Sequence, residues 1–509
     1  VYYRPEWTCG RYEKDTDSAL IYNLIEGMSY LFEDASAKVV GAILMYKRNT
    51  PIPLLEVSKT CVLPIDTLKS FCDSLKNLGL LTDTLPSKDS IIAYRKVARA
   101  KHLQESYVQV DTLKEKTQLS HSNVEIAYME RTGKIASVMF ELTYNCSERC
   151  LHCYNHGATR NEDEQSFRGK RVELELQDYI TLIDTLIAQG LTRVVLSGGD
   201  PFSKPHIWDI MEYLYEKEVA FDLFTNGINA VEDVDRLARL YPRHVGVSLY
   251  STDPITHDAI TRRKGSCEIT KTFIERCGEH GIPLHIKCCI MRPNVSNYYT
   301  VKEFALKVGA IPQFDLNITD SVDGDTCASK YLSLTSEMME VVLTDADLPY
   351  YINGSGLIVK KPNSDEQLCT AGKGNFAITP EGNVQPCCAF PMYLGNVKEK
   401  DIIEIVSRSK PLKEWQSTKC GDLEDCFKHP YCVYCQMCVG NNYIAHGTVL
   451  KASQNNCRLA LERYNLAIKM TDGYDPLKGK NLKDRLADFK YSPIRLERKY
   501  SNNYRDKRG

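Results

Sequence analysis

The chain lacks three features that would place it in broad protein classes. Its 509 residues contain no apolar run of about 18 residues, which excludes an ordinary membrane-spanning helix. Residues 1–5 lack the charged and apolar segments of a secretory signal peptide. The formal net charge is -2, so no basic surplus favours nucleic acid as a partner. We therefore expect a soluble, cytoplasmic protein without a nucleic-acid or membrane partner, of about two to four domains.

Cysteine, in contrast, is abundant, with 20 residues. A cytoplasmic chain does not keep so many cysteines as disulfides. Most of them gather in two segments, 146–153 and 369–457, and such clustering indicates metal binding. Those without ligand spacing are expected to pack as small apolar side chains. They are Cys9, Cys61, Cys72, Cys267, Cys277, Cys288 and Cys289.

The first cysteine group follows the apolar run 138–142. Cys146, Cys150 and Cys153 have the spacing Cys-x3-Cys-x2-Cys. A structural zinc site usually has four ligands in two close pairs, whereas three thiolates leave one corner of an iron–sulfur cube free. A zinc loop with a distant fourth ligand is the alternative, and the patterns around the loop disfavour it.

From residue 136 onward, strand-like and helical stretches alternate. Strands are expected at 138–142, 193–197, 220–224, 244–249, 284–290 and 313–318. Helices are expected at 176–187, 206–217, 230–240, 267–280 and 298–308. This alternation predicts an α/β fold, a parallel sheet covered by helices. The cysteine loop follows the first strand, so it falls at the carboxyl end of the sheet, where the active sites of such barrels lie.

This cysteine spacing on this scaffold resembles the radical S-adenosylmethionine (SAM) superfamily. The resemblance implies a partial (β/α)6 barrel in which Cys146, Cys150 and Cys153 are catalytic and hold a [4Fe–4S] cluster. One electron, from a donor such as flavodoxin or ferredoxin, would let the cluster cleave SAM to a 5′-deoxyadenosyl radical. That radical would then abstract a hydrogen atom from the substrate.

Residues at the strand ends match positions that contact SAM in this superfamily. They are His152, Ser197, Gly198, Gly199, Asp200, Asn226, Ser248, Arg262 and Arg263. The run Ser-Gly-Gly-Asp matches a Gly-Gly-Glu-type motif that contacts the SAM amino group, and Ser248 matches a ribose contact. Whether Arg262 or Arg263 reaches the SAM carboxylate stays open. Ordinary turns and solvated arginines are the alternatives.

The second cysteine group resembles the SPASM domain, which holds auxiliary iron–sulfur clusters. Cys369 and Cys387, with a predicted hairpin turning at Gly382, match its first half. The other candidate ligands are Cys420, Cys426, Cys432, Cys435, Cys438 and Cys457. The resemblance to the SPASM domain implies that one [4Fe–4S] cluster is bound by Cys420, Cys426, Cys432 and Cys457. The other takes Cys369, Cys387 and Cys435, which makes three clusters in all.

Two features depart from the SPASM pattern. Cys435 and Cys438 compete for one ligand position, and no cysteine stands shortly before Cys369. Cys327, Cys388 or Cys438 could supply the missing ligand, or an open site could bind a thiolate of the substrate. A pair of zinc ribbons is the alternative for this region, but it would not account for the barrel motifs.

Residues 1–83 predict a winged-helix unit, with strands at 7–12 and 19–25 and helices at 37–45, 54–57 and 64–78. It resembles the precursor-peptide recognition element related to the chaperone of pyrroloquinoline quinone biosynthesis. That resemblance implies that a leader peptide adds a strand to the sheet edge. DNA binding or dimerisation is the alternative. The helix has only Lys69 and Lys76 as cations, against Asp66 and Asp73, which is poor for phosphate contact.

The remaining segments complete the predicted order. Residues 84–135 form a linker with some helix, 136–320 the radical SAM core, 321–360 a bridge, 361–470 the SPASM domain and 471–509 a basic tail. The whole predicts an enzyme that modifies a ribosomally made precursor peptide, with a thioether crosslink favoured. A carbon–carbon or carbon–oxygen crosslink, or a sulfatase-maturing type of oxidation, is the alternative enzyme reaction. A zinc-binding winged-helix regulator is the rival from another class.

Overall fold

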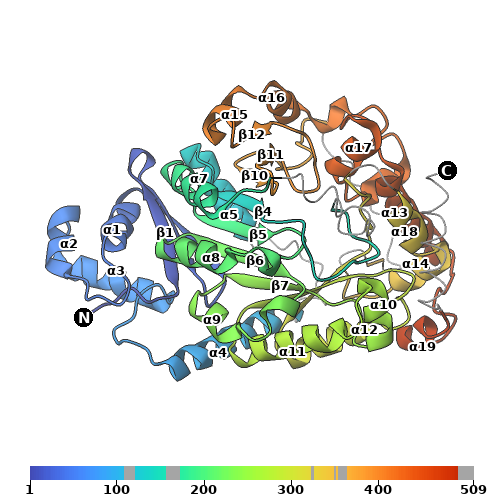
Figure 1. Cartoon of the computed structure of the whole chain (residues 1–509), viewed down its shortest axis with the longest axis horizontal. Helices are drawn as coiled ribbons and strands as arrows, with labels where there is room; N and C mark the ends of the chain where they lie inside the picture. The colour runs from blue at the N-terminus through green and yellow to red at the C-terminus, as the bar shows by residue number, and fades with distance from the viewer. Residues whose placement is uncertain (108–120, 156–171, 323–325, 349–350, 353–363, 491–509) are drawn as a thin grey trace.

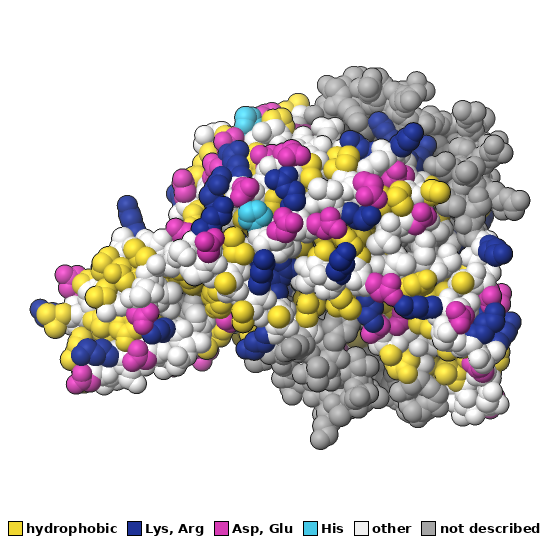
Figure 2. All heavy atoms as spheres, turned by 90° about the horizontal axis from the view of Figure 1, so that it is seen from below, with side chains coloured by type: hydrophobic (Ala, Val, Ile, Leu, Met, Phe, Trp, Pro, Cys, Tyr) yellow, Lys and Arg dark blue, Asp and Glu magenta, His cyan; other side chains and the backbone are white. Residues whose placement is uncertain are grey.

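The protein is described from a computed structural model that covers residues 1–107, 121–155, 172–322, 326–348, 351–352 and 364–490. Figure 1 shows the small N-terminal unit at one end of the molecule, the main sheet in the middle and the C-terminal helices at the other end. Figure 2 shows acidic and basic side chains interspersed over one face. That mixture agrees with the net charge of -2.

The main sheet has nine strands in the order β12-β11-β10-β4-β5-β6-β7-β8-β9. The strands of the predicted barrel are β4 (Ser137–Glu141), β5 (Arg193–Ser197), β6 (Ala220–Thr225), β7 (His244–Ser248), β8 (Leu284–Cys289) and β9 (Ile311–Asp315). They pair in parallel, which confirms the predicted α/β barrel core. β9 ends before Leu316 and Ile318, because these residues are buried in other clusters beyond the strand.

Helices cover one face of this sheet. They are α7 (Leu176–Ala188), α8 (Ile207–Glu216), α9 (Val234–Arg239), α10 (Pro254–Thr261), α11 (Ser266–Glu279) and α12 (Tyr299–Lys307). The helix α10 replaces an expected loop. Asp253 caps it by accepting from the backbone of Ile255 and Thr256, and Pro254 occupies its first turn. Alternate strand residues pack with these helices in the largest apolar core.

The predicted hairpin of the second cysteine region extends the barrel sheet. Its strands are β10 (Asn375–Ile378) and β11 (Asn383–Gln385), and β12 (Gly395–Asn396) follows. Gly382 turns the hairpin with φ +91°, which a side chain would oppose. β10 pairs in parallel with β4, so the hairpin is joined to the strand that precedes the first cysteine loop. That pairing links residues far apart in the sequence, and no local pattern predicts it.

The N-terminal unit contains one more strand than expected. It consists of β1 (Thr8–Glu13), β2 (Ser18–Asn23), β3 (Met28–Glu33), α1 (Asp34–Leu44), α2 (Leu54–Cys61) and α3 (Ile65–Asn77). The three strands form a separate antiparallel sheet in the order β1-β2-β3. The helices cover one face of it around a core of their own.

The expected linker holds two helices, α4 (Lys88–Tyr107) and α5 (His121–Thr132). Buried Arg95 and Arg99 fasten α4 to the barrel. Arg95 Nη2 donates to the Ala238 carbonyl at 2.8 Å, and Arg99 Nη1 donates to the Ile282 carbonyl at 2.6 Å. The described part of this segment is therefore packed on the barrel.

The C-terminal half is mostly helical. Its helices are α13 (Cys327–Leu332), α14 (Ser336–Val342), α15 (Ile402–Arg408), α16 (Lys410–Ser417), α17 (Val439–His446), α18 (Gln454–Thr471) and α19 (Leu482–Leu486). The helices α14, α18 and α19 surround a second core, whereas α15, α16 and α17 pack on the main core. Arg485 of the expected tail is buried and pairs with Glu337 at 2.7 Å. The tail therefore packs on α14 as far as residue 490, and the rest lies outside the described residues. Over that part of the chain, no helix combines the length and apolar character needed to cross a membrane.

Candidate active site and iron–sulfur centres

The first cysteine loop follows β4 and is held from both sides. The amides of Arg149 and Leu151 donate to the carbonyls of Thr261 and Ile260, each at 2.9 Å, at the end of α10. The side-chain amide of Asn226 donates to Cys146 Sγ at 3.5 Å and to Ser147 Oγ at 3.2 Å. The loop is thus fixed at the carboxyl edge of the sheet, as predicted.

Two glycines after β5 allow the chain before the loop to pass closely. A Cβ on Gly198 would stand 2.4 Å from the Thr143 carbonyl, and a Cβ on Gly199 would stand 2.4 Å from the Asn145 carbonyl. Gly199 N donates to Thr143 O at 2.6 Å. These glycines therefore set the path of the cysteine loop, whether or not their backbone also contacts SAM. Ser197 ends β5 beside them and is half-buried.

Asp200 offers an unused acceptor next to the cysteines. Its side chain is buried, and Oδ1 accepts from Thr225 Oγ1 at 2.5 Å and from Asn226 N at 3.3 Å. Oδ2 has no hydrogen-bond partner, and burial raises the pKa of Asp200 to about 6. A buried acceptor without a donor is uncommon, and the amino group of SAM is a donor of the right kind.

The three thiols suit a cluster rather than a single ion. Burial raises the pKa of Cys146 to about 12 and that of Cys153 to about 11, so they need a bound cation to become thiolates. Within the described chain, no group of three or more candidate ligands is arranged to hold one metal ion. Each thiolate of a [4Fe–4S] cluster binds a different iron, so its ligands stand further apart than around zinc.

Aromatic rings lie on the far side of the loop. The ring of His152 meets Tyr250 edge-on at 4.6 Å, and Tyr250 stacks on His257 at 5.6 Å. His152 Nδ1 is buried without a partner, and burial lowers the pKa of His152 to about 4. Ser248 ends β7, half-buried. The predicted SAM contacts on these elements thus lie around one loop.

The structure separates the two candidate arginines. Arg262 is exposed and has φ +56° at the end of α10. Arg263 donates from Nη1 to the Ser147 carbonyl at 3.0 Å. Arg263 therefore positions the cysteine loop.

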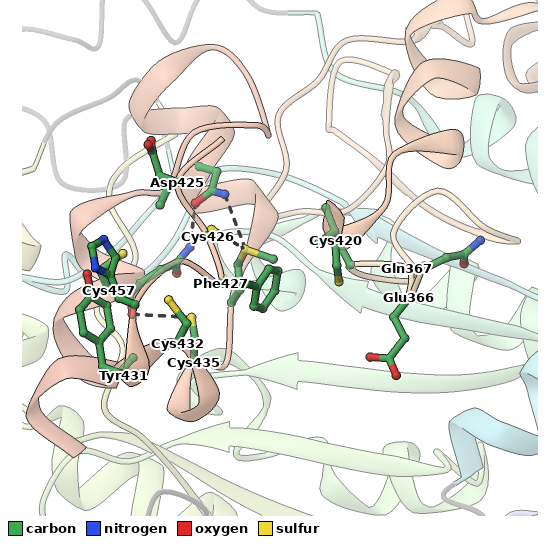
Figure 3. Close-up of a pocket in the computed structure, with 17 residues that line it drawn as sticks. Glu366, Gln367, Cys420, Asp425, Cys426, Phe427, Tyr431, Cys432, Cys435 and Cys457 are labelled. Atoms are coloured by element: carbon green, nitrogen blue, oxygen red, sulfur yellow. Dashed lines mark hydrogen bonds between the residues drawn. The ribbon is translucent and has the colours of Figure 1, made fainter. Parts of the chain in front are cut away.

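The second cysteine region divides into two groups. One lines a cavity of about 190 Å³ and contains Cys420, Cys426, Cys432, Cys435 and Cys457. Figure 3 shows Cys426, Cys432, Cys435 and Cys457 near one another and Cys420 set apart. The electrostatic neighbours of Cys435 are Cys457, Cys426 and Cys432. Five thiols therefore line this pocket, one more than the four ligands that a cubane cluster takes.

The other group contains Cys369, Cys387 and Cys438, since Cys438 has the other two as electrostatic neighbours. This corrects the carried-over assignment, which placed Cys435 there. The physical cause is packing: a Cβ on Gly440 would stand 1.8 Å from the Ala389 carbonyl, so the start of α17 abuts the turn after Cys387. Cys435 instead lies beside Cys432 in the first group, since its backbone N–H donates to the Cys432 carbonyl at 3.1 Å.

The sequence analysis did not identify three residues that lie near the cysteines as candidate site residues. Glu141 ends β4, is 3% exposed and has an oxygen without a partner. Burial raises its pKa to about 8, with Cys387 adding to the shift. Tyr154 hydrogen-bonds Cys388, whose Sγ is 4.0 Å from Cys387 Sγ. Glu148, inside the first loop, also has a buried oxygen without a partner. Glu141 could have been found from the sequence, because a glutamate within a strand of apolar residues is unusual.

Cys327, a candidate cluster ligand, begins α13, and its side chain lies outside the described residues.

Two family models match the chain. Residues 140–298 match the radical SAM superfamily, and residues 369–439 match SPASM, the iron–sulfur cluster-binding domain. Among curated proteins, the subtilosin biosynthesis protein AlbA of Bacillus subtilis is 25% identical over 312 residues, which cover 59% of this chain and 66% of AlbA. The sporulation killing factor maturation protein SkfB of the same species is 26% identical over 299 residues, 57% of this chain and 70% of SkfB.

A solved structure supports the fold over nearly the whole chain. It is SuiB of Streptococcus suis bound to its precursor peptide SuiA, with a TM-score of 0.52 and 14% identity. The match covers 90% of this chain and 100% of SuiB. The chain therefore contains a radical SAM domain and a C-terminal SPASM domain, the domains that use SAM with a [4Fe–4S] cluster and auxiliary iron–sulfur clusters.

Proposed function

We propose that this enzyme modifies a ribosomally synthesised precursor peptide. AlbA and SkfB are named for bacteriocin biosynthesis and killing-factor maturation, and SuiB was solved with a precursor peptide. The observation that carries the proposal is the position of the auxiliary cysteines, whose hairpin strand β10 pairs with β4 directly before the first cysteine loop. When bound, SAM and its cluster supply a radical that removes a hydrogen atom from the substrate.

The N-terminal unit supports a site for the leader peptide. Within the described residues β3 pairs only with β2, so its other edge has no strand partner there and could accept an extended peptide. Phe32 of β3 meets Phe71 of α3 edge-on at 6.1 Å, which provides an apolar floor beside that edge. A leader bound here raises the concentration of the core peptide at the barrel.

This part of the proposal is tested by leader affinity. Phe71→Ala should weaken binding of the precursor's leader by about tenfold, because it removes apolar contact beside β3. Leu55→Ala is the control, since Leu55 is 63% exposed on α2, away from the strand edge. Unchanged affinity of the Phe71 variant, with SAM cleavage intact in both, would exclude this leader site.

The bond we favour is a thioether. Cys369, Cys387 and Cys438 provide three thiols, one fewer than a cubane needs. Cys388 Sγ lies 4.0 Å from Cys387 Sγ and also hydrogen-bonds Tyr154. A cysteine of the substrate could take the fourth position, held as a thiolate next to the carbon to which it is joined. If Cys388 or Cys327 completes the cluster instead, a carbon–carbon or carbon–oxygen crosslink or a side-chain oxidation becomes the product.

Mass spectrometry of the precursor tests the reaction. The reconstituted enzyme, SAM, and a flavodoxin or ferredoxin as electron donor are incubated anaerobically with the precursor. We expect the loss of two hydrogen atoms and one cysteine that no longer reacts with an alkylating reagent. The same loss with every cysteine still reactive would contradict the thioether, and an unmodified precursor would contradict the proposed function.

A further inference from the structure

The face of the sheet opposite the helices contains a buried carboxyl group without a partner. In β4, Val138, Phe140 and Leu142 pack in the main core with the helices. Glu141 therefore points to the other face, which we call the inner face. It is 3% exposed, and within the described residues no donor reaches its Oε1. Because buried acceptors are nearly always hydrogen-bonded, this one indicates a donor that the described chain does not supply.

The inner face beside Glu141 is not filled by the described chain. Ser197 of β5 is the neighbour of Glu141 in register and is only half-buried. Met139, which precedes Glu141 on the same face of β4, is also half-buried. These two side chains remain partly accessible next to the carboxyl, so a ligand group has access to this part of the face.

Only acidic groups act on this carboxyl. Its electrostatic neighbours are Cys387 and Glu381, and both disfavour a negative charge on it. Glu141 in turn acts on Cys153 and Tyr154, whose other electrostatic neighbours in the described chain are also acidic. No lysine or arginine is among them. A cation placed here would therefore be attracted by every titratable group around it.

The carboxyl lies where the two cysteine regions meet. Cys153 belongs to the first loop and Cys387 to the second region, and both are electrostatic neighbours of Glu141. In the proposed reaction, the substrate residue that reacts lies between the adenosyl radical and the auxiliary cluster. A group that pairs with Glu141 is therefore close to that residue.

We propose that Glu141 binds a cationic side chain of the substrate peptide, an ammonium or a guanidinium, next to the residue that reacts. This inference rests on the proposed function, because it takes the peptide as the source of the cation. An ammonium or guanidinium can donate to either oxygen of the carboxyl, and such charged hydrogen bonds are stronger than neutral ones. A neutral N–H could also donate, but only a cation offsets the acidic surroundings.

The test uses the cluster-loaded enzyme with SAM present and three small probes. N-acetyl-L-lysine amide and N-acetyl-L-arginine amide are cationic. N-acetyl-L-norleucine amide keeps the carbon stem of lysine and lacks its ammonium. Calorimetry measures the affinity of each probe for the wild type, Glu141→Gln and Glu141→Asp. Glu404→Gln on α15 is the control, since Glu404 pairs with Arg408 at 2.9 Å away from the cysteine regions.

The wild type and Glu404→Gln should bind at least one cationic probe about tenfold more tightly than the norleucine probe. Glu141→Gln should lose this preference, and Glu141→Asp, which keeps the carboxylate, should retain part of it. Thermal unfolding is measured on the same samples. Glu141→Gln should be no less stable than the wild type, because its carboxyl has no partner to lose in the described chain.

Two results would overturn the proposal. One is a wild type without preference for either cationic probe, and the other is a preference that Glu141→Gln keeps. SAM is itself a cation, so equilibrium dialysis of SAM gives a further check: its affinity should be the same for the wild type and Glu141→Gln, and a tenfold loss would assign Glu141 to SAM instead. An unmodified precursor would contradict only the proposed function, because probe binding is measured without turnover.

Discussion

At the residue scale, the cysteines show how position decides the role of a thiol. Cys435 and Cys438 are separated by two residues, yet they belong to different groups. Cys420 and Cys426 share a pocket and are electrostatic neighbours, although Figure 3 draws Cys420 to one side of the other thiols. The spacing in the sequence identifies candidate ligands. The packing of η7 (Pro430–Tyr434) and α17 decides which of the two cysteine groups each ligand joins.

This sorting predicts different outcomes for two substitutions. Cys435→Ala should remove about four irons per chain, because it takes one of four close thiols from a cubane site. Cys61→Ala, in α2 of the N-terminal unit and outside both cysteine groups, should leave the iron content nearly unchanged. Iron analysis with electron paramagnetic resonance of the reduced auxiliary clusters measures both. Equal iron loss in the two variants would contradict the grouping.

His257 predicts a pH dependence of stability. It is buried, its Nδ1 accepts from Tyr250 N at 3.2 Å, and burial lowers its pKa to about 4. The unfolded chain has a histidine pKa of about 6.5. As the pH falls below about 6.5 the unfolded state takes up a proton and the folded state does not, so stability falls until pH about 4. At pH 5 the loss from this residue is about 2 kcal/mol.

The measurement is urea unfolding at pH 7.5 and pH 5. His257→Gln keeps a hydrogen-bond acceptor but does not titrate, so its stability should fall less between the two pH values. His206, a half-exposed histidine directly before α8 and beside Asp209, provides the control through His206→Gln. An identical pH dependence in wild type and His257→Gln would rule out this role.

At the element scale, the N-terminal unit is joined to the barrel by buried polar groups. Tyr22 of β2 donates to Glu125 of α5 at 2.7 Å. Glu125 pairs with Arg193 at the start of β5 through two bonds of 2.7 and 2.6 Å, and Arg193 also donates to Asp222 on β6 at 2.8 Å. This network fixes α5 between the N-terminal unit and the barrel. Deleting residues 1–83 would disturb it, so point substitutions test leader binding better.

Glu125→Ala should therefore lower the free energy of unfolding by about 3 kcal/mol, because it leaves part of the Arg193 charge buried and unpaired. Glu268→Ala is the matched control from an exposed pair and should change stability by less than about 1 kcal/mol. Chemical denaturation of the cluster-loaded proteins measures both. A small and equal effect of the two substitutions would show that the network does not hold the elements together.

At the scale of the whole molecule, the features that the sequence predicts best are those set by local patterns, namely strands, helices and closely spaced cysteines. The strand and helix pattern from 138 to 308 and the loop Cys146–Cys153 are found where the periodicity and spacing place them. The pairing of β10 with β4 and the separation of Cys435 from Cys438 depend on contacts across long stretches of chain. Glu141 could not be placed on the face of the sheet opposite the helices until the packing of β4 was known.

The central claim is that Cys146, Cys150 and Cys153 hold the cluster that cleaves SAM, separately from the auxiliary cysteines. The direct measurement is 5′-deoxyadenosine formation by the triple variant Cys146→Ala/Cys150→Ala/Cys153→Ala after anaerobic reconstitution, with iron determined on the same sample. We predict no 5′-deoxyadenosine and substantial retained iron at the cysteines of 369–457. Continued SAM cleavage by the triple variant would contradict the account.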